Sequence, residues 1–217
     1  MAFRPAAALA LLLALPALAA CDSGRDYPAD AEDARYDLAG MALQVSDLPP
    51  GFAQEEIPDP VFDNLDWSLV FDTDDPGGKE AQLAAQGRLT NHVAAFSATE
   101  LGPVFAVTNV STLYADNDAA RKALDQFACG LPINDSVQLE PLLVPDIADG
   151  SIGFLVPLDG TGASGLVDTT ICFRTGRIVH AIQQTSIPGV EDLALSVRLA
   201  KRMLDHVDAA FDKLDES

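Results

Sequence analysis

The most regular hydrophobic pattern lies at the C-terminal end of the chain. Apolar residues recur there every three or four positions, the spacing of a single helix face, at Leu193, Val197, Ala200, Leu204, Val207, Phe211 and Leu214. Glu191 and Asp192 lie directly before this stripe, in the first turn of the predicted helix. Acidic side chains there are favoured by the positive end of the helix dipole. The pattern predicts one amphipathic helix of about 25 residues.

Strand patterns fill the middle of the chain. β-branched and aromatic residues dominate several short runs, of which VFAVTNVSTLY at 104–114 is the strongest. Thr175 and Gly176 separate the last two runs and predict a hairpin. The expected strands cover residues 67–71, 89–97, 104–114, 137–144, 152–158, 166–173 and 177–183.

Shorter helices are expected at two places between these strands. One covers residues 79–86, and the other begins at the capping residues Asp116, Asn117 and Asp118 and ends at Gly130. Runs of strands with few helices, one of them terminal, are typical of the α+β class. We therefore expect a mainly antiparallel sheet covered by the long C-terminal helix and by one or two shorter helices.

The chain is strongly acidic. It has 217 residues, with 33 acidic against 13 basic side chains and a formal net charge of −20. Because phosphate binding draws on lysine and arginine, this balance argues against nucleic acid as a partner. It also disfavours docking onto anionic lipid through a basic patch.

The N-terminus has the pattern of an export signal. Arg4 precedes an uncharged apolar run whose helix would reach about 24 Å, short of the roughly 30 Å hydrocarbon core of a bilayer. Leu18-Ala19-Ala20-Cys21 then closely resembles the lipobox of bacterial lipoproteins. The resemblance implies a signal peptide at 1–20 and lipidation of the Cys21 thiol, with palmitate as a marker of the lipid. The alternative is an ordinary cleaved secretory peptide.

This resemblance sets the expected domain organisation. Residues 21–40 are polar and acidic, and predict a lipidated flexible tether with a reach on the order of 25 Å. Residues 41–217 predict a single globular α+β domain. The lipid would hold this domain at the extracytoplasmic face of the cell membrane, since two acyl chains are enough for stable anchoring.

Two further cysteines remain for the folded domain. An exported chain enters an oxidising compartment, so Cys129 and Cys172 are a possible disulfide. Such a bridge would stabilise the fold by roughly 4 kcal/mol in the chain-entropy model. Two buried free thiols are the alternative.

Other motifs do not predict a cofactor, a metal site or a catalytic residue. The GxGxxG sequence at 160–165 precedes a strand pattern, whereas a dinucleotide site needs a helix there. The acidic residues Asp72, Asp74 and Asp75 lack the remaining ligands of an EF-hand, which leaves a calcium-stabilised loop as a minor hypothesis. The histidines are far apart in sequence, without metal-binding spacing, at His92, His180 and His206.

The body of the chain has a looser resemblance. It rests on the DLPPGF turn at 47–52, on Gly87-Arg88 before a strand, on FRTGR at 173–177 and on the terminal helix. These features are similar to bacterial envelope lipoproteins, some of which have α+β folds like the Mog/PsbP family. The resemblance implies the architecture and assigns no catalytic residue.

Two functional hypotheses follow. The first is a non-enzymatic binding module of the cell envelope, whose partner is an envelope protein or an apolar ligand held between the sheet and the terminal helix. The second is a carboxylate-dependent envelope hydrolase, which needs two carboxylates about 5–9 Å apart in a cleft.

Overall fold

Long antiparallel strands form the centre of the fold in the computed structural model, which describes residues 25–71, 74–126, 129, 131, 139–158 and 165–215. The sheet has the order β1-β3-β4-β8-β7-β6-β5, and β2 also pairs with β3. The strands are β1 (Phe52–Gln54), β2 (Val61–Phe62), β3 (Arg88–Ala98), β4 (Val104–Tyr114), β5 (Glu140–Leu142), β6 (Ser151–Pro157), β7 (Val167–Thr175) and β8 (Ile178–Ser186).

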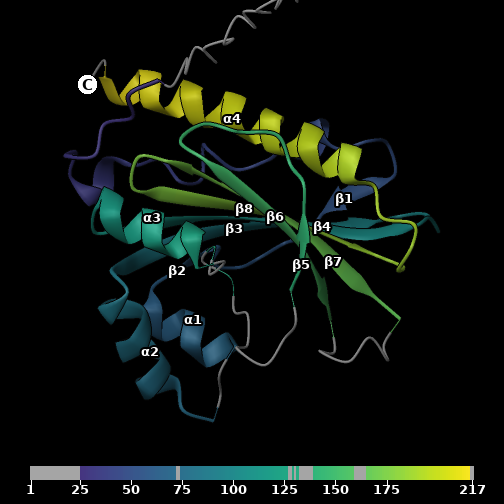
Figure 1. Cartoon of the computed structure of the whole chain (residues 1–217), viewed down its shortest axis with the longest axis horizontal. Coiled ribbons are helices and arrows are strands. Elements are labelled where there is room, and N and C mark those ends of the chain that lie inside the picture. The colour runs from purple at the N-terminus through teal and green to yellow at the C-terminus, as the bar shows by residue number, and fades with distance from the viewer. Residues whose placement is uncertain are drawn as a thin grey trace, which may run out of the picture.

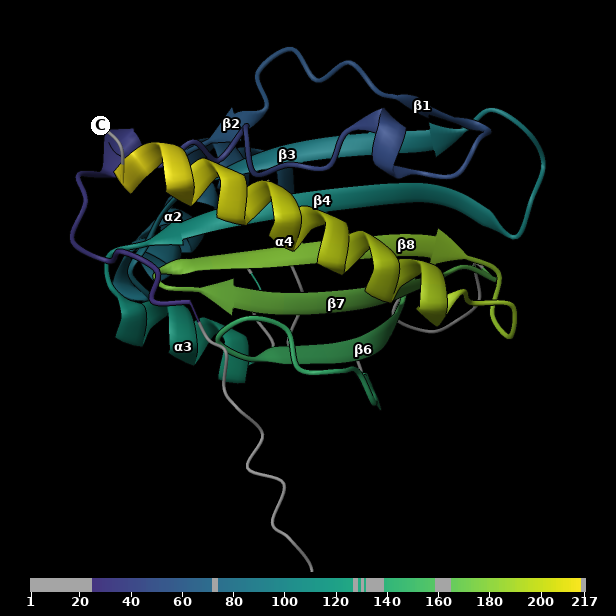
Figure 2. The ribbon, with the colours of Figure 1, turned by 90° about the horizontal axis from the view of Figure 1, so that it is seen from above.

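Helices cover both faces of this sheet. The long helix α4 (Leu193–Asp215) crosses one face, which we call the upper face (Figures 1 and 2). The helices α1 (Asn64–Phe71), α2 (Pro76–Ala85) and α3 (Asn117–Asp125) lie on the opposite, lower face (Figure 1). This arrangement confirms the predicted α+β class with a long C-terminal helix. Within the described residues, no helix is both long and apolar enough to span a membrane.

The upper face and α4 enclose the main hydrophobic core. Phe96, Phe173 and Ile182 from the sheet pack with Leu199 and Met203 from α4, and all are at most 1% exposed. Burial of each such side chain contributes roughly 1.5–3 kcal/mol. These side chains pack between the sheet and α4, in the layer where the sequence analysis placed an apolar ligand.

Most strand predictions are confirmed to within two or three residues. The strand at 104–114 is found with those bounds, and the hairpin joins β7 to β8. Gly176 in its turn has φ +57°, a conformation that glycine adopts without strain. The strand expected at 137–144 is shorter, because β5 covers three residues and residues 137 and 138 lie outside the described ones.

One strand prediction is wrong, and the residues form a helix. Residues 67–71 were expected to form a strand but belong to α1. A short apolar run does not distinguish a strand from a buried helix segment. The deciding signal lies before it, since the Asp63 carboxylate accepts the Asp66 N–H at 2.8 Å and caps the first turn. The other two helices are confirmed, with Asp75 and Asp116 as their N-caps.

Residues 25–43, which we call the N-terminal strap, pack along the C-terminal half of α4. Arg25 pairs with Asp212 at 2.8 Å, and the Tyr27 hydroxyl donates to Asp208 Oδ1 at 3.0 Å. Tyr36 and Met41 are 7% and 1% exposed, in a cluster with Phe211 and Leu214 of α4. The flexible coil expected for residues 22–40 is therefore wrong for 25–40, because their aromatic and apolar side chains have a surface to bury against.

Short strands close both edges of the sheet. On one side β1 pairs with the end of β3 and β2 pairs with its middle, through Val61 opposite His92. On the other side, β5 pairs with β6 and carries Pro141, which has no N–H to donate. Both long outer strands are thus partly covered.

Candidate functional site

The lower face of the sheet carries polar residues at positions that a core would normally fill with apolar ones. Asn91 of β3 lies directly opposite Thr112 of β4 in the strand register. Both side chains are 0% exposed. Asn91 Nδ2 and Oδ1 and Thr112 Oγ1 have no hydrogen-bond partner. Buried polar groups are nearly always paired, so these unpaired atoms mark the region as a candidate site.

Arg88, at the start of β3, extends this polar group toward α1. Its side chain is 2% exposed although it carries a charge. Nη1 donates to Asn64 Oδ1 at 2.6 Å and to the Asp63 carbonyl at 3.3 Å. Nε and Nη2 have no partner. The guanidinium lies over the Trp67 ring, 5.2 Å from its centroid, which fixes one side of its plane.

Arg88 lacks a counter-ion among the described residues. The Asp63 carboxylate accepts the Asp66 N–H in the α1 cap, and none of the ion pairs within the described residues includes Arg88. Burial lowers the pKa of Arg88 to about 10. Burial also raises the pKa of Tyr114, which lies opposite Arg88 in the register, to about 12. The region thus holds one desolvated cation beside a neutral phenol.

The polar character continues along the lower face. Asp168 of β7 accepts a hydrogen bond from Thr185 of β8 at 2.6 Å, and burial raises the pKa of this carboxyl group. Thr170, two residues along β7, is buried with its hydroxyl unpaired. Within the described residues, Asp168 is the one acidic residue that is almost fully buried.

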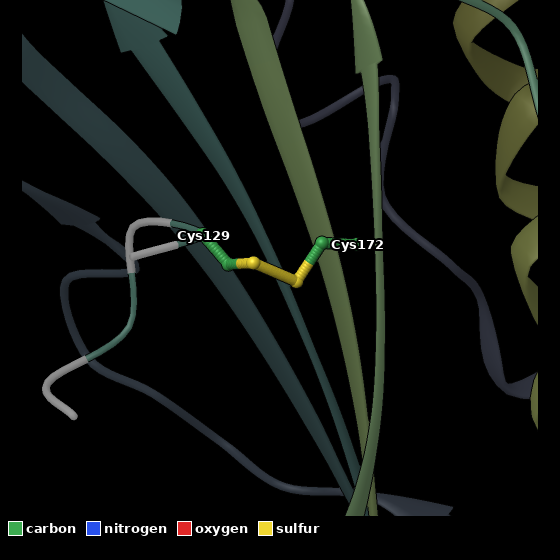
Figure 3. Close-up of a disulfide and its surroundings, with 2 residues drawn as sticks. All are labelled: Cys129 and Cys172. Carbon is green, nitrogen blue, oxygen red and sulfur yellow. A yellow bond between two sulfur atoms is a disulfide. The ribbon is translucent and has the colours of Figure 1, made fainter. Parts of the chain in front are cut away.

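Of the two cysteines expected to pair, Cys129 follows α3 and Cys172 belongs to β7. In the structure Cys129 and Cys172 form a disulfide, with their Cα atoms 6.0 Å apart (Figure 3). Both residues are 0% exposed. The bridge therefore attaches the segment after α3 to the centre of the lower face. Cys21, the expected lipidation site, lies outside the described residues.

The histidines do not form a common site. His180 is buried on the upper face, between the Ser111 hydroxyl at 3.0 Å and the Thr175 hydroxyl at 2.8 Å. His92 is buried in β3, and burial lowers its pKa. His206 of α4 contacts Asp47 Oδ2 at 2.8 Å, in the short 3-10 turn that follows the strap.

The remaining motifs have structural roles where they are described. Asp75 caps α2 by accepting the Gly78 N–H at 3.0 Å, and Asp72 lies outside the described residues. No group of three His, Cys, Asp or Glu within the described residues has the arrangement of a metal site. Of the GxGxxG sequence only Gly165 is described, and the strand β7 follows it, as predicted.

An open groove of about 490 Å³ lies at the surface between α2 and α3. Gln86, Gly87, Asp116 and Lys122 are among its lining residues. The unpaired buried atoms of the lower face are not among the groove's lining residues, so we do not assign it as the site.

No protein-family model matches the chain, and no curated protein matches it. Among solved structures, the extracellular domain of PknH from Mycobacterium tuberculosis is similar to it, with a TM-score of 0.48 and 14% sequence identity. The similarity covers 84% of this chain and 99% of that domain.

Proposed function

We propose that this chain is a lipid-anchored, non-enzymatic binding module on the extracytoplasmic side of the cell membrane, and that it receives its ligand at the lower face of the sheet. One observation carries the binding function. Arg88, Asn91 and Thr112 hold five buried polar atoms without a partner, all at one end of this face. An unpaired buried polar group costs roughly 1–3 kcal/mol, and a ligand that pairs with these groups recovers that cost.

The arrangement of ionisable groups supports binding over catalysis. A hydrolase of the second hypothesis would need two carboxylates in one cleft, and Asp168 stands alone among the described buried carboxylates. His180 is enclosed by hydroxyl groups and the Phe173 ring, and has no exposed surface from which to act on a substrate.

The anchor in this proposal rests on the Leu18-Ala19-Ala20-Cys21 sequence. It is tested by metabolic labelling with palmitate and by membrane fractionation. The wild-type chain should incorporate the label and sediment with membranes, and Cys21→Ser should do neither. An unlabelled, soluble wild-type chain would contradict the anchor without affecting the ligand site.

The binding function is tested by releasing whatever the protein retains through purification. The full chain is extracted in mild detergent, denatured, and its small-molecule fraction analysed by liquid chromatography and mass spectrometry. A stoichiometric small molecule should accompany the wild-type chain and be lost from an Asn91→Leu/Thr112→Val variant.

Thr169→Val is the matched control for this experiment. Thr169 is a buried threonine with an unpaired hydroxyl in the same sheet, but it lies on the upper face beneath α4. The control variant should retain the molecule. If the wild-type chain retains no ligand, and Thr112→Val and Thr169→Val stabilise the fold equally, the unpaired atoms are ordinary packing defects and the binding proposal is wrong.

A further inference from the structure

The free edge of Arg88 has the geometry of a carboxylate-binding group. A guanidinium presents Nε–H and one Nη–H along the same edge, and this pair binds both oxygens of a carboxylate in parallel. In Arg88 the other nitrogen, Nη1, is occupied by Asn64 Oδ1 and the Asp63 carbonyl. Nε and Nη2, which form the edge that recognises a carboxylate, remain buried and without a hydrogen-bond partner.

Two neutral donors lie on the same face of the same two strands. Asn91 follows Arg88 along β3, after an irregularity in the register, and Thr112 is its direct partner on β4. Side chains of such directly opposed residues are about 5 Å apart at Cβ. A carboxylate offers about four lone-pair sites. Arg88 Nε and Nη2, Asn91 Nδ2 and Thr112 Oγ1 are four buried donors without a partner.

We propose that Arg88, Asn91 and Thr112 form a buried site for the carboxylate group of a small monoanionic ligand. This inference rests on the proposed binding function and names the chemical class of its ligand. One guanidinium charge balances one carboxylate charge, whereas a dianion such as phosphate would leave a buried negative charge inside a chain of net charge −20.

The surroundings of the site favour a short apolar remainder on the ligand. Trp67 lies on one side of the guanidinium and is itself in edge contact with Phe62, with the ring centroids 5.6 Å apart. Val93 and Val110 continue the lower face two register positions beyond Asn91 and Thr112. An aliphatic acid of a few carbons satisfies both the polar and the apolar parts of this environment.

The chain carries its own reporter for this site. Trp67 is the one tryptophan in the sequence, and it lies directly on Arg88. The full chain in mild detergent, freed of retained small molecules by dialysis, is titrated with butyrate while the Trp67 fluorescence is followed. We expect a saturable change with butyrate and none with butyramide, the neutral isostere of the same size. Phosphate at matched ionic strength should bind more weakly than butyrate.

Variants separate the carboxylate site from a general effect on folding. Arg88→Gln should weaken butyrate binding by more than about tenfold, since it removes a charge-assisted bidentate contact. Because Arg88→Gln disturbs the α1 contacts, Thr112→Val serves as a milder variant and should also weaken butyrate binding, with Thr169→Val as the unaffected control. Circular dichroism verifies that each variant is folded.

The outcomes distinguish this inference from the binding function on which it rests. An equal response to butyrate and butyramide, or unchanged butyrate affinity in both Arg88→Gln and Thr112→Val, overturns the carboxylate site. If the retained molecule of the native protein is then neutral, the binding function stands with a different ligand class. If nothing is retained and neither probe changes the fluorescence, both proposals fail.

Discussion

His180 lies at the centre of the upper face, with each ring nitrogen next to a hydroxyl group. Ser111 and Thr175 can act as donor and acceptor toward one neutral imidazole, and Phe173 stacks on the ring at 4.7 Å. Burial lowers the pKa of His180 to about 3, from an ordinary value of 6.5. The folded protein therefore holds this histidine neutral at neutral and mildly acidic pH.

Acid should destabilise the fold through His180. Between pH 6.5 and 3 the unfolded chain binds a proton at this histidine and the folded chain does not, so the free energy of unfolding falls as the pH falls. The loss from pH 7 to pH 4 should be about 3 kcal/mol at this residue. Urea unfolding of wild type and His180→Gln at pH 7, 5.5 and 4 measures it.

The variant provides the control within the same experiment. His180→Gln should be less stable than wild type at pH 7, by about 1–3 kcal/mol, because a buried hydrogen bond is lost. It should then lose about 3 kcal/mol less than wild type on acidification. Parallel stability curves for the two proteins would show that His180 is not the acid-sensitive group.

Arg88 presents the opposite case, a buried side chain that keeps its charge. Its pKa of about 10 against an ordinary 12.5 corresponds to about 3 kcal/mol of destabilisation at neutral pH. The unfolded chain binds more protons between these two pH values, so the cost disappears only as the pH rises above 10. At neutral pH, a carboxylate bound at the proposed site would offset the cost of burying the Arg88 charge.

At the scale of elements, the disulfide joins the segment that follows α3 to β7. This attachment holds one end of the lower-face layer against the sheet (Figure 3). The Cys129→Ala/Cys172→Ala variant should lose roughly 4 kcal/mol of stability in the chain-entropy model. Urea unfolding with and without reductant measures the effect, and reduced wild type should match the variant.

Thiol titration tests the bond itself. Cys21→Ser removes the third thiol of the chain, so that titration of the denatured, unreduced variant reports on Cys129 and Cys172 alone. It should detect no free thiol. Two free thiols per chain would show that the pair is reduced in the protein as isolated.

Elements with a long repeating pattern could be predicted from the sequence, and short ones could not. Regular spacing identified α4, and a long run of β-branched and aromatic residues identified β4 with its correct bounds. The five-residue run at 67–71 has no period of its own, and Asp63, which decides its helical state, acts through a backbone cap. The strap was missed because residues 25–40 have a polar, acidic composition that is typical of a flexible segment. In the structure Tyr27 and Tyr36 pack against Phe211.

The candidate site required the structure for a different reason. The sequence shows Arg88 only as the residue that opens a strand, amid a large excess of acidic side chains. Its isolation depends on where those carboxylates are directed, since Asp63 turns its oxygen to the cap of α1. The pairing of Asn91 with Thr112 likewise depends on the register of β3 and β4. The sequence shows Arg88, but only the structure shows that it has no counter-ion among the described residues.

At the scale of the whole molecule, the strap places the proposed anchor near one end of α4. Arg25 lies four positions after Cys21, a span of at most about 14 Å. Arg25 contacts Asp208, Asp212 and Asp215 near the C-terminal end of the helix. The helix itself is about 34 Å long. A lipid on Cys21 would therefore hold that end of the molecule close to the bilayer.

This geometry predicts a fixed orientation on the membrane. A dye on Lys213→Cys, near the end of α4, should transfer energy strongly to an acceptor on lipid headgroups. The same dye on Glu100→Cys, in the β3–β4 loop at the other end of the sheet (Figure 2), should transfer weakly. The measurement uses the lipidated chain in vesicles.

Release of the strap should abolish the difference between the two dye positions. Arg25→Ala with Tyr27→Ser removes the ion pairs to α4 and the ring contact with Phe211, and should bring the two transfer efficiencies together. Equal transfer from both positions in the unmodified strap would show that the domain tumbles freely on its anchor.

The covered sheet edges have a consequence for a protein held at a membrane. The proposed anchor would confine many copies to a plane, where collisions between neighbours would be frequent and side-on. Open strand edges would then pair from one copy to the next and spread as an aggregate. β1 and β2 occupy stretches of one border, and Pro141 interrupts the other. These features reduce the length of strand edge that is available for pairing between neighbouring copies.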